Sequence, residues 1–142
     1  TAKMASRLTA IIAEVRAAVR HARLSRAVTM TGPVAEVATR MRGWDLFVSM
    51  SSDEGQGLAV LEAMALGVPV LARAVAGITH FLRPGRTGYA LERVSARGAA
   101  TALAATLAAS DLIATTRRAR RMVERQYSWT ATAAAFERLY CR

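Results

Sequence analysis

Apolar residues along this chain fall into two kinds of pattern, one with helical spacing and one of short uninterrupted runs. Near the start, their helical spacing predicts an amphipathic helix; these residues are Met4, Leu8, Ile11, Ile12, Val15, Val19 and Ala22. Short apolar and β-branched runs at residues 27–31, 45–50 and 70–73 predict strands. The alternation of helix and strand indicates an α/β fold, a Rossmann-like doubly wound parallel sheet with flanking helices.

From Ser95 onward the pattern predicts only helices. The first is alanine-rich and ends near Ala109, the second covers residues 111–126, and the third begins after Ser128, a residue type favoured as a helix N-cap. In the second helix we expect an inward-facing stripe of Leu112, Ile113, Ala119, Met122 and Val123. In the C-terminal helix, at about residues 129–142, we expect one face to anchor the helix to the domain; this face carries Trp129, Ala133, Phe136 and Tyr140.

The most informative segment follows the run at residues 45–50. Its loop, residues 51–57 with the sequence SSDEGQG, contains Gly55 and Gly57, which let backbone N–H groups approach a ligand closely. The next helix is predicted at residues 58–66, because Gly67 suits the left-handed position after a helix and Pro69 prevents its continuation. A loop at the carboxyl end of a parallel strand is where α/β proteins bind ligands.

One charged residue, Glu62, lies on this helix, whose two faces are otherwise apolar. We therefore expect the helix to be buried and its carboxylate to need hydrogen-bond donors, which ligand hydroxyls would supply. The free N–H groups and the dipole at the helix start favour a diphosphate there. Glu54, just ahead of this anion site, is placed to accept hydrogen bonds from an attached sugar. The alternative, two solvated glutamates, does not account for the glycines and the apolar helix between them.

The sequence EGQGLAVLEAMALGVPV, residues 54–70, resembles the retaining glycosyltransferases of family 4, which have the two-domain architecture called GT-B. That family carries two glutamates separated by seven residues, as this chain does. The resemblance implies that Glu54, with Gly55 beside it, contacts the hydroxyls of the donor sugar and that Glu62 binds the ribose. Gly57 and Leu58 would donate backbone N–H groups to the diphosphate. Gln56 also belongs to the donor site, but it stands where an aromatic or aliphatic residue is more usual, which bears on the identity of the sugar.

Other segments are also similar to the C-terminal, nucleotide-sugar-binding domain of that family. Residues 83–88 resemble a turn of the family with the pattern D-G-x-T-G. Residues 127–129, with the sequence YSW, resemble the F-S-W that precedes the family's last helix. His80 stands where the family often has glutamate; it either contacts a ligand at the cleft edge or, as we expect, is a partly exposed cap of a short helix. Thr31 and Gly32 either contact the nucleobase or only form a turn.

Length and composition fit a single domain, residues 1–142, with 53% hydrophobic residues. The chain shows neither a signal peptide nor an apolar run long enough to span a membrane. Its single cysteine, Cys141, allows no disulfide within the chain and, with two histidines far apart, predicts no metal site. We expect a cytoplasmic protein, with peripheral contact at the inner face of the membrane as an open alternative.

The net charge of +10 comes mostly from arginine. A dense run on the predicted helix at 111–126 contains Arg117, Arg118, Arg120, Arg121 and Arg125. Three interpretations compete: a solvated helix face, docking on an anionic membrane that presents a lipid-linked acceptor, and nucleic-acid binding. We favour the solvated face. Nucleic-acid binding is the interpretation with the least support, because no aromatic residues alternate with these arginines and no nucleic-acid-binding motif occurs.

By resemblance, the parent enzyme would move a hexosyl group from a nucleoside-diphosphate sugar to an acceptor hydroxyl with retention, with neither a further cofactor nor a metal. Glu54 is our candidate catalytic residue, for donor positioning and electrostatic support. Nothing ahead of residue 27 matches the first two strands of the family domain, and its N-terminal acceptor domain has no counterpart, so this chain alone should bind donor weakly and transfer nothing. Alternatives are a non-catalytic half-enzyme that completes its cleft with a second chain, an epimerase, or a phosphorylase, which would need a cofactor lysine where this chain has only Lys3.

Overall fold

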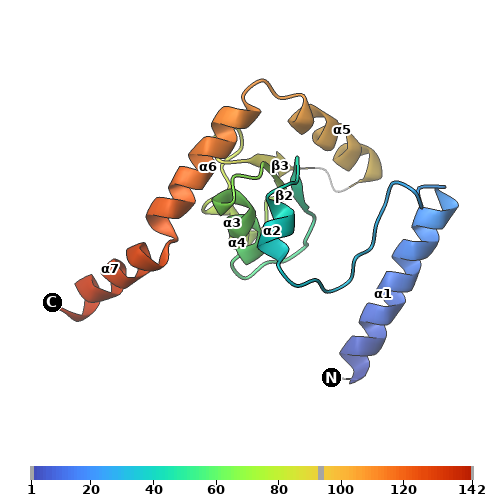
Figure 1. The fold of residues 1–142 in the computed structure, drawn as a ribbon, viewed down its shortest axis with the longest axis horizontal. Helices are drawn as coiled ribbons and strands as arrows, with labels where there is room; N and C mark the ends of the chain where they lie inside the picture. Colours follow the sequence, from blue (N-terminus) through green and yellow to red (C-terminus); the bar gives the residue numbers. More distant parts are fainter. Residues whose placement is uncertain (1, 93–94, 142) are drawn as a thin grey trace. The chain divides into compact units, whose positions relative to one another are not determined.

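The chain divides into two compact units, Thr1–Ala35 and Glu36–Arg142. The structure, a computed structural model, describes residues 2–92 and 95–141, so residue 142 at the end of the predicted last helix lies outside the described residues. The first unit contains one helix and an irregular segment, whereas the second contains the sheet and the other described helices (Figure 1).

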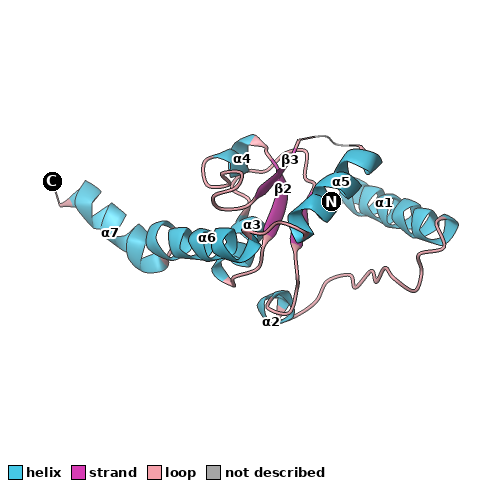
Figure 2. Cartoon of the chain, turned by 90° about the horizontal axis from the view of Figure 1, so that it is seen from above, coloured by secondary structure: helices cyan, strands magenta, loops and turns pink. Residues whose placement is uncertain are grey.

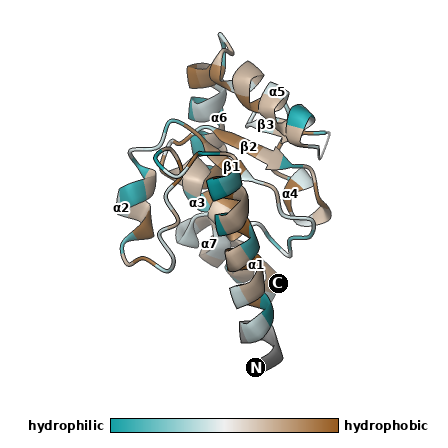
Figure 3. Ribbon diagram, turned by 90° about the vertical axis from the view of Figure 1, so that its right-hand side faces the viewer, coloured by the Kyte–Doolittle hydropathy of each residue, from teal (hydrophilic) through white to brown (hydrophobic). Residues whose placement is uncertain are grey.

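The first unit begins with α1, Ala2–His21, which confirms the predicted N-terminal helix. Teal and brown residues alternate along α1 in Figure 3, as in an amphipathic helix. The helix ends where Arg23 adopts a left-handed φ of 56° and the Leu24 N–H donates to the Val19 carbonyl at 2.9 Å. This bond over five residues is the Schellman pattern of helix termination.

The strand predicted at residues 27–31 is wrong, because this segment is irregular in the structure. The N–H groups of Ala27 and Val28 donate to the Leu24 carbonyl at 2.8 and 2.9 Å and so close a local turn. None of the three strands in residues 2–92 and 95–141 pairs with the segment, and Val28 and Met30 are exposed. A β-type pattern of side chains forms a strand only where a neighbour satisfies the backbone polar groups.

The second unit is built on three parallel strands, which confirms the predicted α/β class. The strands are β1 (Phe47–Ser49), β2 (Val70–Arg73) and β3 (Tyr89–Leu91), and they lie in the order β1-β2-β3. Figure 2 shows helices around these strands. The helices of this unit are α2 (Val37–Met41), α3 (Leu58–Ala65), α4 (Ala76–Thr79), α5 (Ala96–Leu107), α6 (Leu112–Gln126) and α7 (Trp129–Tyr140).

The hydrophobic core forms where α3 packs against β1, β2 and α6. Its largest fully buried side chains include Val60, Met64, Ile78 and Phe81. Helix α5 packs against β2 and β3. Helix α3, which precedes β2 in the sequence, and helix α5, which follows it, therefore both pack against this central strand. All apolar side chains of β2 are accordingly buried.

Helix α6 faces the core with residues spaced four apart, Thr115, Ala119 and Val123, all of them buried. The prediction is confirmed for Ala119 and Val123, but it is wrong for Ile113, whose side chain is 69% exposed. Two residues correspond to about 200° around a helix, so Ile113 points away from the core when Thr115 faces it.

Helix α7 begins at its predicted N-cap, where the Ser128 hydroxyl accepts a hydrogen bond from the Ala131 N–H at 3.2 Å. The expectation that its aromatic face anchors it to the domain is wrong. Trp129 is 90% exposed and Tyr140 82% exposed, and α7 has no buried residue. Figure 1 shows α7 continuing beyond α6, away from the sheet, and within the second unit the large apolar side chains of α7 are exposed.

No single helix among the described residues is long and apolar enough to cross a membrane. Helix α5 and the stretch Leu112–Tyr140 meet the same length and composition criteria only together, as a pair bent by 93°.

The start of α6 is joined to β3 by a network of hydrogen bonds around Asp111. The Tyr89 hydroxyl donates to Asp111 Oδ1 at 2.6 Å and the Thr115 hydroxyl to Oδ2 at 2.9 Å, while Arg118 lies 3.7 Å from Oδ2. These donors, Tyr89 first, hold the pKa of Asp111 below its ordinary value. Partial burial, together with the hydrogen bond to Asp111, raises the pKa of Tyr89.

We expect Asp111→Asn to lower the stability of the protein at neutral pH and to lose this effect in acid. Because the folded-state pKa of Asp111 lies below its ordinary value of 3.8, its contribution to stability is present above 3.8 and is lost as the pH falls through the lower folded-state value. Thermal unfolding between about pH 7 and pH 2.5 measures the difference in Tm between wild type and variant. Replacement of the exposed Asp53 by Asn is the control. A difference in Tm between wild type and Asp111→Asn that stayed the same from neutral to acid pH would contradict the prediction.

Candidate functional site

The glycine-containing loop at residues 51–57 follows β1, and the segment that leads into α4 follows β2. Because the strands are parallel, both segments lie at the carboxyl edge of the sheet, where α/β proteins bind ligands. The structure therefore places the predicted loop at the edge that the sequence indicated.

Gly57 forms the start of α3. It has a left-handed backbone, φ 63° and ψ 43°, and a Cβ added to it would lie 2.9 Å from Cγ1 of Ile78. The Val60 and Leu61 N–H groups donate to the Gly57 carbonyl at 3.0 and 3.1 Å. No side chain caps the helix, so the N–H groups at its start are left to bind a ligand or water.

A second glycine, Gly77, brings the loops after β1 and β2 together. A Cβ at this position would overlap the backbone of Glu54 and lie 2.8 Å from the carbonyl carbon of Gly55. Gly77 is therefore a site residue that our sequence analysis missed. Its glycine was visible in the sequence, but the contact that requires it joins segments more than twenty residues apart.

The carboxylate of Glu62 is exposed, so the expectation of a helix buried on all sides is wrong. Helix α3 buries Val60, Leu61, Ala63 and Met64 against the sheet and α6. Leu58 and Glu62, four residues apart, share the opposite face, and Leu58 is 60% exposed. Glu54 in the preceding loop is half-buried.

The open face of α3 forms one wall of a groove of about 360 Å³. The loop and α3 contribute Gln56, Leu58 and Glu62, and the other wall comes from the end of α6 and the start of α7, with Val123, Tyr127, Trp129 and Thr132. The structure thus brings together three of the predicted site residues. Trp129, expected to anchor α7, is instead a wall of this groove.

The remaining predicted residues lie in other places. Glu54, Gly55 and Gly57 belong to the same loop but do not line the groove. Thr31 and Gly32 lie in the first unit, where Gly32 has a left-handed φ of 64°. The Thr31 hydroxyl donates to the Gly32 carbonyl at 3.2 Å.

His80 is the C-terminal cap residue of the short helix α4 and is exposed, which confirms the expected helix-capping role. Its ring makes an edge contact with Phe81 at 4.9 Å and lies 6.4 Å from the ring of Tyr127, both distances between ring centroids. Among the described residues, no group of three or more His, Cys, Asp and Glu side chains could hold a metal ion.

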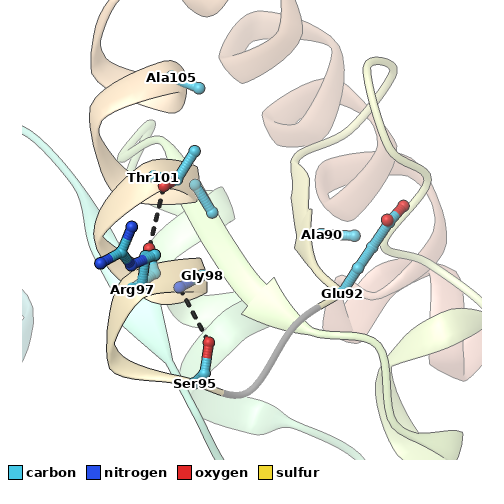
Figure 4. Close-up of a pocket in the computed structure, with 8 residues that line it drawn as sticks. Ala90, Glu92, Ser95, Arg97, Gly98, Thr101 and Ala105 are labelled. Carbon is cyan, nitrogen blue, oxygen red and sulfur yellow. Dashed lines mark hydrogen bonds between the residues drawn. The ribbon is translucent and has the colours of Figure 1, made fainter.

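A pocket of about 460 Å³ lies beside the end of β3 and the first turns of α5 (Figure 4). Ser95 accepts a hydrogen bond from the Gly98 N–H at 3.0 Å, and Thr101 donates to the Arg97 carbonyl at 3.0 Å. Both side chains thus bond to backbone groups of α5 itself. Figure 4 shows Glu92 and Arg97 on opposite sides of the pocket. It lacks the converging polar groups of a ligand site.

Comparison with known proteins gives consistent matches. The family described as Glycosyl transferases group 1 matches residues 6–109 of this chain. The D-inositol 3-phosphate glycosyltransferase of Thermobispora bispora is 33% identical over 108 residues, which are 76% of this chain and 25% of that protein. This chain therefore spans about a quarter of the length of that relative.

Solved structures share the fold. Sucrose-phosphate synthase from Thermosynechococcus elongatus matches with a TM-score of 0.82 and 28% identity, over 92% of this chain and 34% of that chain. Anabaena Alr3699/HepE in complex with UDP and glucose matches with a TM-score of 0.81 and 21% identity, over 92% of this chain and 36% of that chain.

The replacement Gly77→Ala should destabilise the protein by about 1–3 kcal/mol, because the added methyl group would force apart the loops after β1 and β2. Gly55→Ala is a matched control in the same loop, since a Cβ there meets no atom within 4 Å. Urea unfolding of the two variants measures both effects. Equal midpoints for Gly77→Ala and wild type would show that the two loops do not depend on this contact.

Proposed function

The chain belongs to the glycosyl transferases group 1 family, and on that basis we propose that it is the donor-binding domain of a larger glycosyltransferase. It binds a nucleoside-diphosphate sugar at the carboxyl edge of the sheet, and the full enzyme transfers a hexosyl group from this donor to an acceptor hydroxyl. The residues that bind the donor lie on the loop after β1 and on the open face of α3.

The observation that carries this proposal is the pairing of a groove with an uncapped helix start. Gln56, Leu58 and Glu62 line one groove, and the first N–H groups of α3 have no side-chain acceptor. Carboxylate oxygens bind sugar hydroxyls, and a helix start binds phosphate. A nucleotide sugar carries both kinds of group. The structure of the Anabaena protein with UDP and glucose supports this choice of ligand.

Each residue has a distinct role in the proposed complex. The backbone N–H groups of Gly57 and Leu58 donate to the diphosphate. Glu62 accepts hydrogen bonds from the ribose; because its carboxylate is already exposed to water, no partner in residues 2–92 and 95–141 has to be displaced first. Glu54 accepts hydrogen bonds from the hexose beside Gly55.

Gln56 lines the groove next to these positions, and we assign to it the choice among hexoses.

In the proposed reaction, the bond from the anomeric carbon to the leaving phosphate breaks, and a bond to the acceptor oxygen forms on the same face of the sugar. The electron pair of the broken bond leaves with the nucleoside diphosphate, whose oxygen gains negative charge and takes up the proton that the acceptor hydroxyl loses. The N-terminal end of α3 stabilises that charge through its dipole and its free N–H groups. Glu54 positions the hexose and supports the developing positive charge on the ring.

The acceptor-binding part of the enzyme comes from a further domain or from a second chain. Strand β1 is an edge of the described sheet and pairs on one side with β2, so its other side is open to additional strands. A half-enzyme that completes its cleft with another chain would use the same edge, and co-purification of such a chain would favour that version. We place the protein in the cytoplasm, where its exposed Cys141 stays reduced.

We expect UDP, GDP or one of their sugar conjugates to shift the amide NMR signals of residues 55–62, and Glu62→Ala to weaken this binding by roughly tenfold or more, because a charged hydrogen-bond acceptor is lost. Glu124→Ala is the control, since Glu124 makes only an exposed ion pair with Arg120. Shifts that are unchanged in Glu62→Ala would exclude the assigned role of this carboxylate.

The isolated chain should bind donor but transfer no sugar. The proposed reaction needs an acceptor oxygen held against the anomeric carbon, and we assign the described groove residues to the donor. Release of UDP or GDP from the sugar conjugates, measured with and without simple acceptors, tests this expectation. Turnover of the isolated chain at ordinary enzyme rates would contradict it.

A further inference from the structure

A second pocket in the same unit has a strongly basic lining. It has a volume of about 210 Å³ and lies between the end of α4, the turn at residues 83–88 and α6. Its charged and polar lining includes His80, Arg83, Arg86, Arg118 and Gln126. None of the residues assigned to the donor lines it, so the proposed reaction leaves this pocket without an assigned role.

The turn that carries Arg83 and Arg86 is held by bonds of its own. The Thr87 hydroxyl donates to the Phe81 carbonyl at 2.6 Å and accepts from the Arg83 N–H at 2.8 Å. The Arg86 N–H donates to the Arg83 carbonyl at 2.9 Å, and the Gly85 N–H to the Gly88 carbonyl at 2.9 Å. One wall of the pocket is therefore fixed before any ligand binds.

Arg118 fixes the other wall. Its Nε donates to the Arg86 carbonyl at 2.9 Å, and its Nη2 donates to the Gly85 carbonyl at 3.0 Å and to the Thr115 hydroxyl at 2.7 Å. These bonds join α6 to the turn and hold the guanidinium plane in one orientation. Nε and both hydrogens of Nη2 are used within the chain, so Arg118 offers a ligand its Nη1 group, held in place without a further loss of side-chain entropy.

The positive charge of the pocket is not balanced within the described residues. Among residues 2–92 and 95–141, the recorded ion pairs are Arg118 with Asp111, at 3.7 Å, and Arg120 with Glu124. Neither Arg83 nor Arg86 has an acidic partner in that part of the chain. These two arginines thus bring uncompensated positive charge to one small pocket, and a bound anion would offset their repulsion.

We propose that this pocket binds a phosphate group carried by a molecule other than the sugar donor. Guanidinium groups match phosphate oxygens in pairs of parallel hydrogen bonds, which favours phosphate over a monatomic anion. The pocket shares no lining residue with the donor groove, although its His80 ring lies 6.4 Å from the ring of Tyr127 in the groove wall. The phosphate belongs either to an anionic lipid headgroup or to a soluble phosphorylated compound.

The first test titrates the full chain with inorganic phosphate at constant ionic strength and follows the amide NMR signals of residues 80–88 and 115–126. The variant Arg83→Gln/Arg86→Gln should raise the Kd for phosphate by roughly tenfold for each arginine. The matched control, Arg117→Gln/Arg121→Gln, removes the same charge from positions of α6 that are exposed like Arg83 and Arg86 but do not line the pocket, and it should leave the Kd nearly unchanged.

Three results would overturn the proposal: an equal loss of affinity in both double variants, an absence of phosphate binding, or shifts confined to residues 55–62, which would assign phosphate to the donor site. A second test distinguishes the sources of the phosphate by sedimentation with vesicles of phosphatidylcholine and phosphatidylglycerol. Vesicle binding that is lost in Arg83→Gln/Arg86→Gln but kept in the control identifies a lipid headgroup. Phosphate binding that depends on the pocket, without pocket-dependent vesicle binding, identifies a soluble phosphorylated compound.

Discussion

The packing of α3 against the sheet and α6 is the constraint on which the proposed donor site depends. Val60, Ala63 and Met64 are buried there, and in a helix this choice also determines which residues face outward. Leu58 and Glu62 lie on the remaining face and therefore line the groove. The hydrophobic core thus orients the carboxylate, and a change in the packing of α3 would move it even if Glu62 itself were unchanged.

The shape of the loop ahead of α3 depends on places where side chains are absent. Gly57 starts α3 with a left-handed backbone beside Ile78, and Gly77 lets the segment after β2 touch the backbone of Glu54. Backbone N–H groups at a helix start can hold a diphosphate only if the loop is held against its support. Gly57 follows β1 and Gly77 follows β2, so the shape of the loop depends on the pairing of these two strands.

The sequence predicted features that depend on neighbours along the chain. The strand at 70–73 and the cap at Ser128 are confirmed, because turn chemistry and propensity act over a few residues. The strand at 27–31, the anchoring role of Trp129 and the burial of Glu62 are wrong, because each requires a partner from elsewhere in the fold. An apolar pattern shows which face of an element prefers to leave water, but not whether another element covers that face.

The arginines show why net charge alone does not identify a partner. Arg117, Arg121 and Arg125 on α6 are exposed, in agreement with the solvated face that we favoured, and Arg120 pairs with Glu124 at 2.8 Å. Exposed charges of this kind contribute little to stability and attract anions without selectivity. Arg118 differs, because its guanidinium is bonded to two backbone carbonyls and a hydroxyl. Selective binding of an anion requires this fixed geometry, so the placement of a few arginines, and not their number, determines where a phosphate can be recognised.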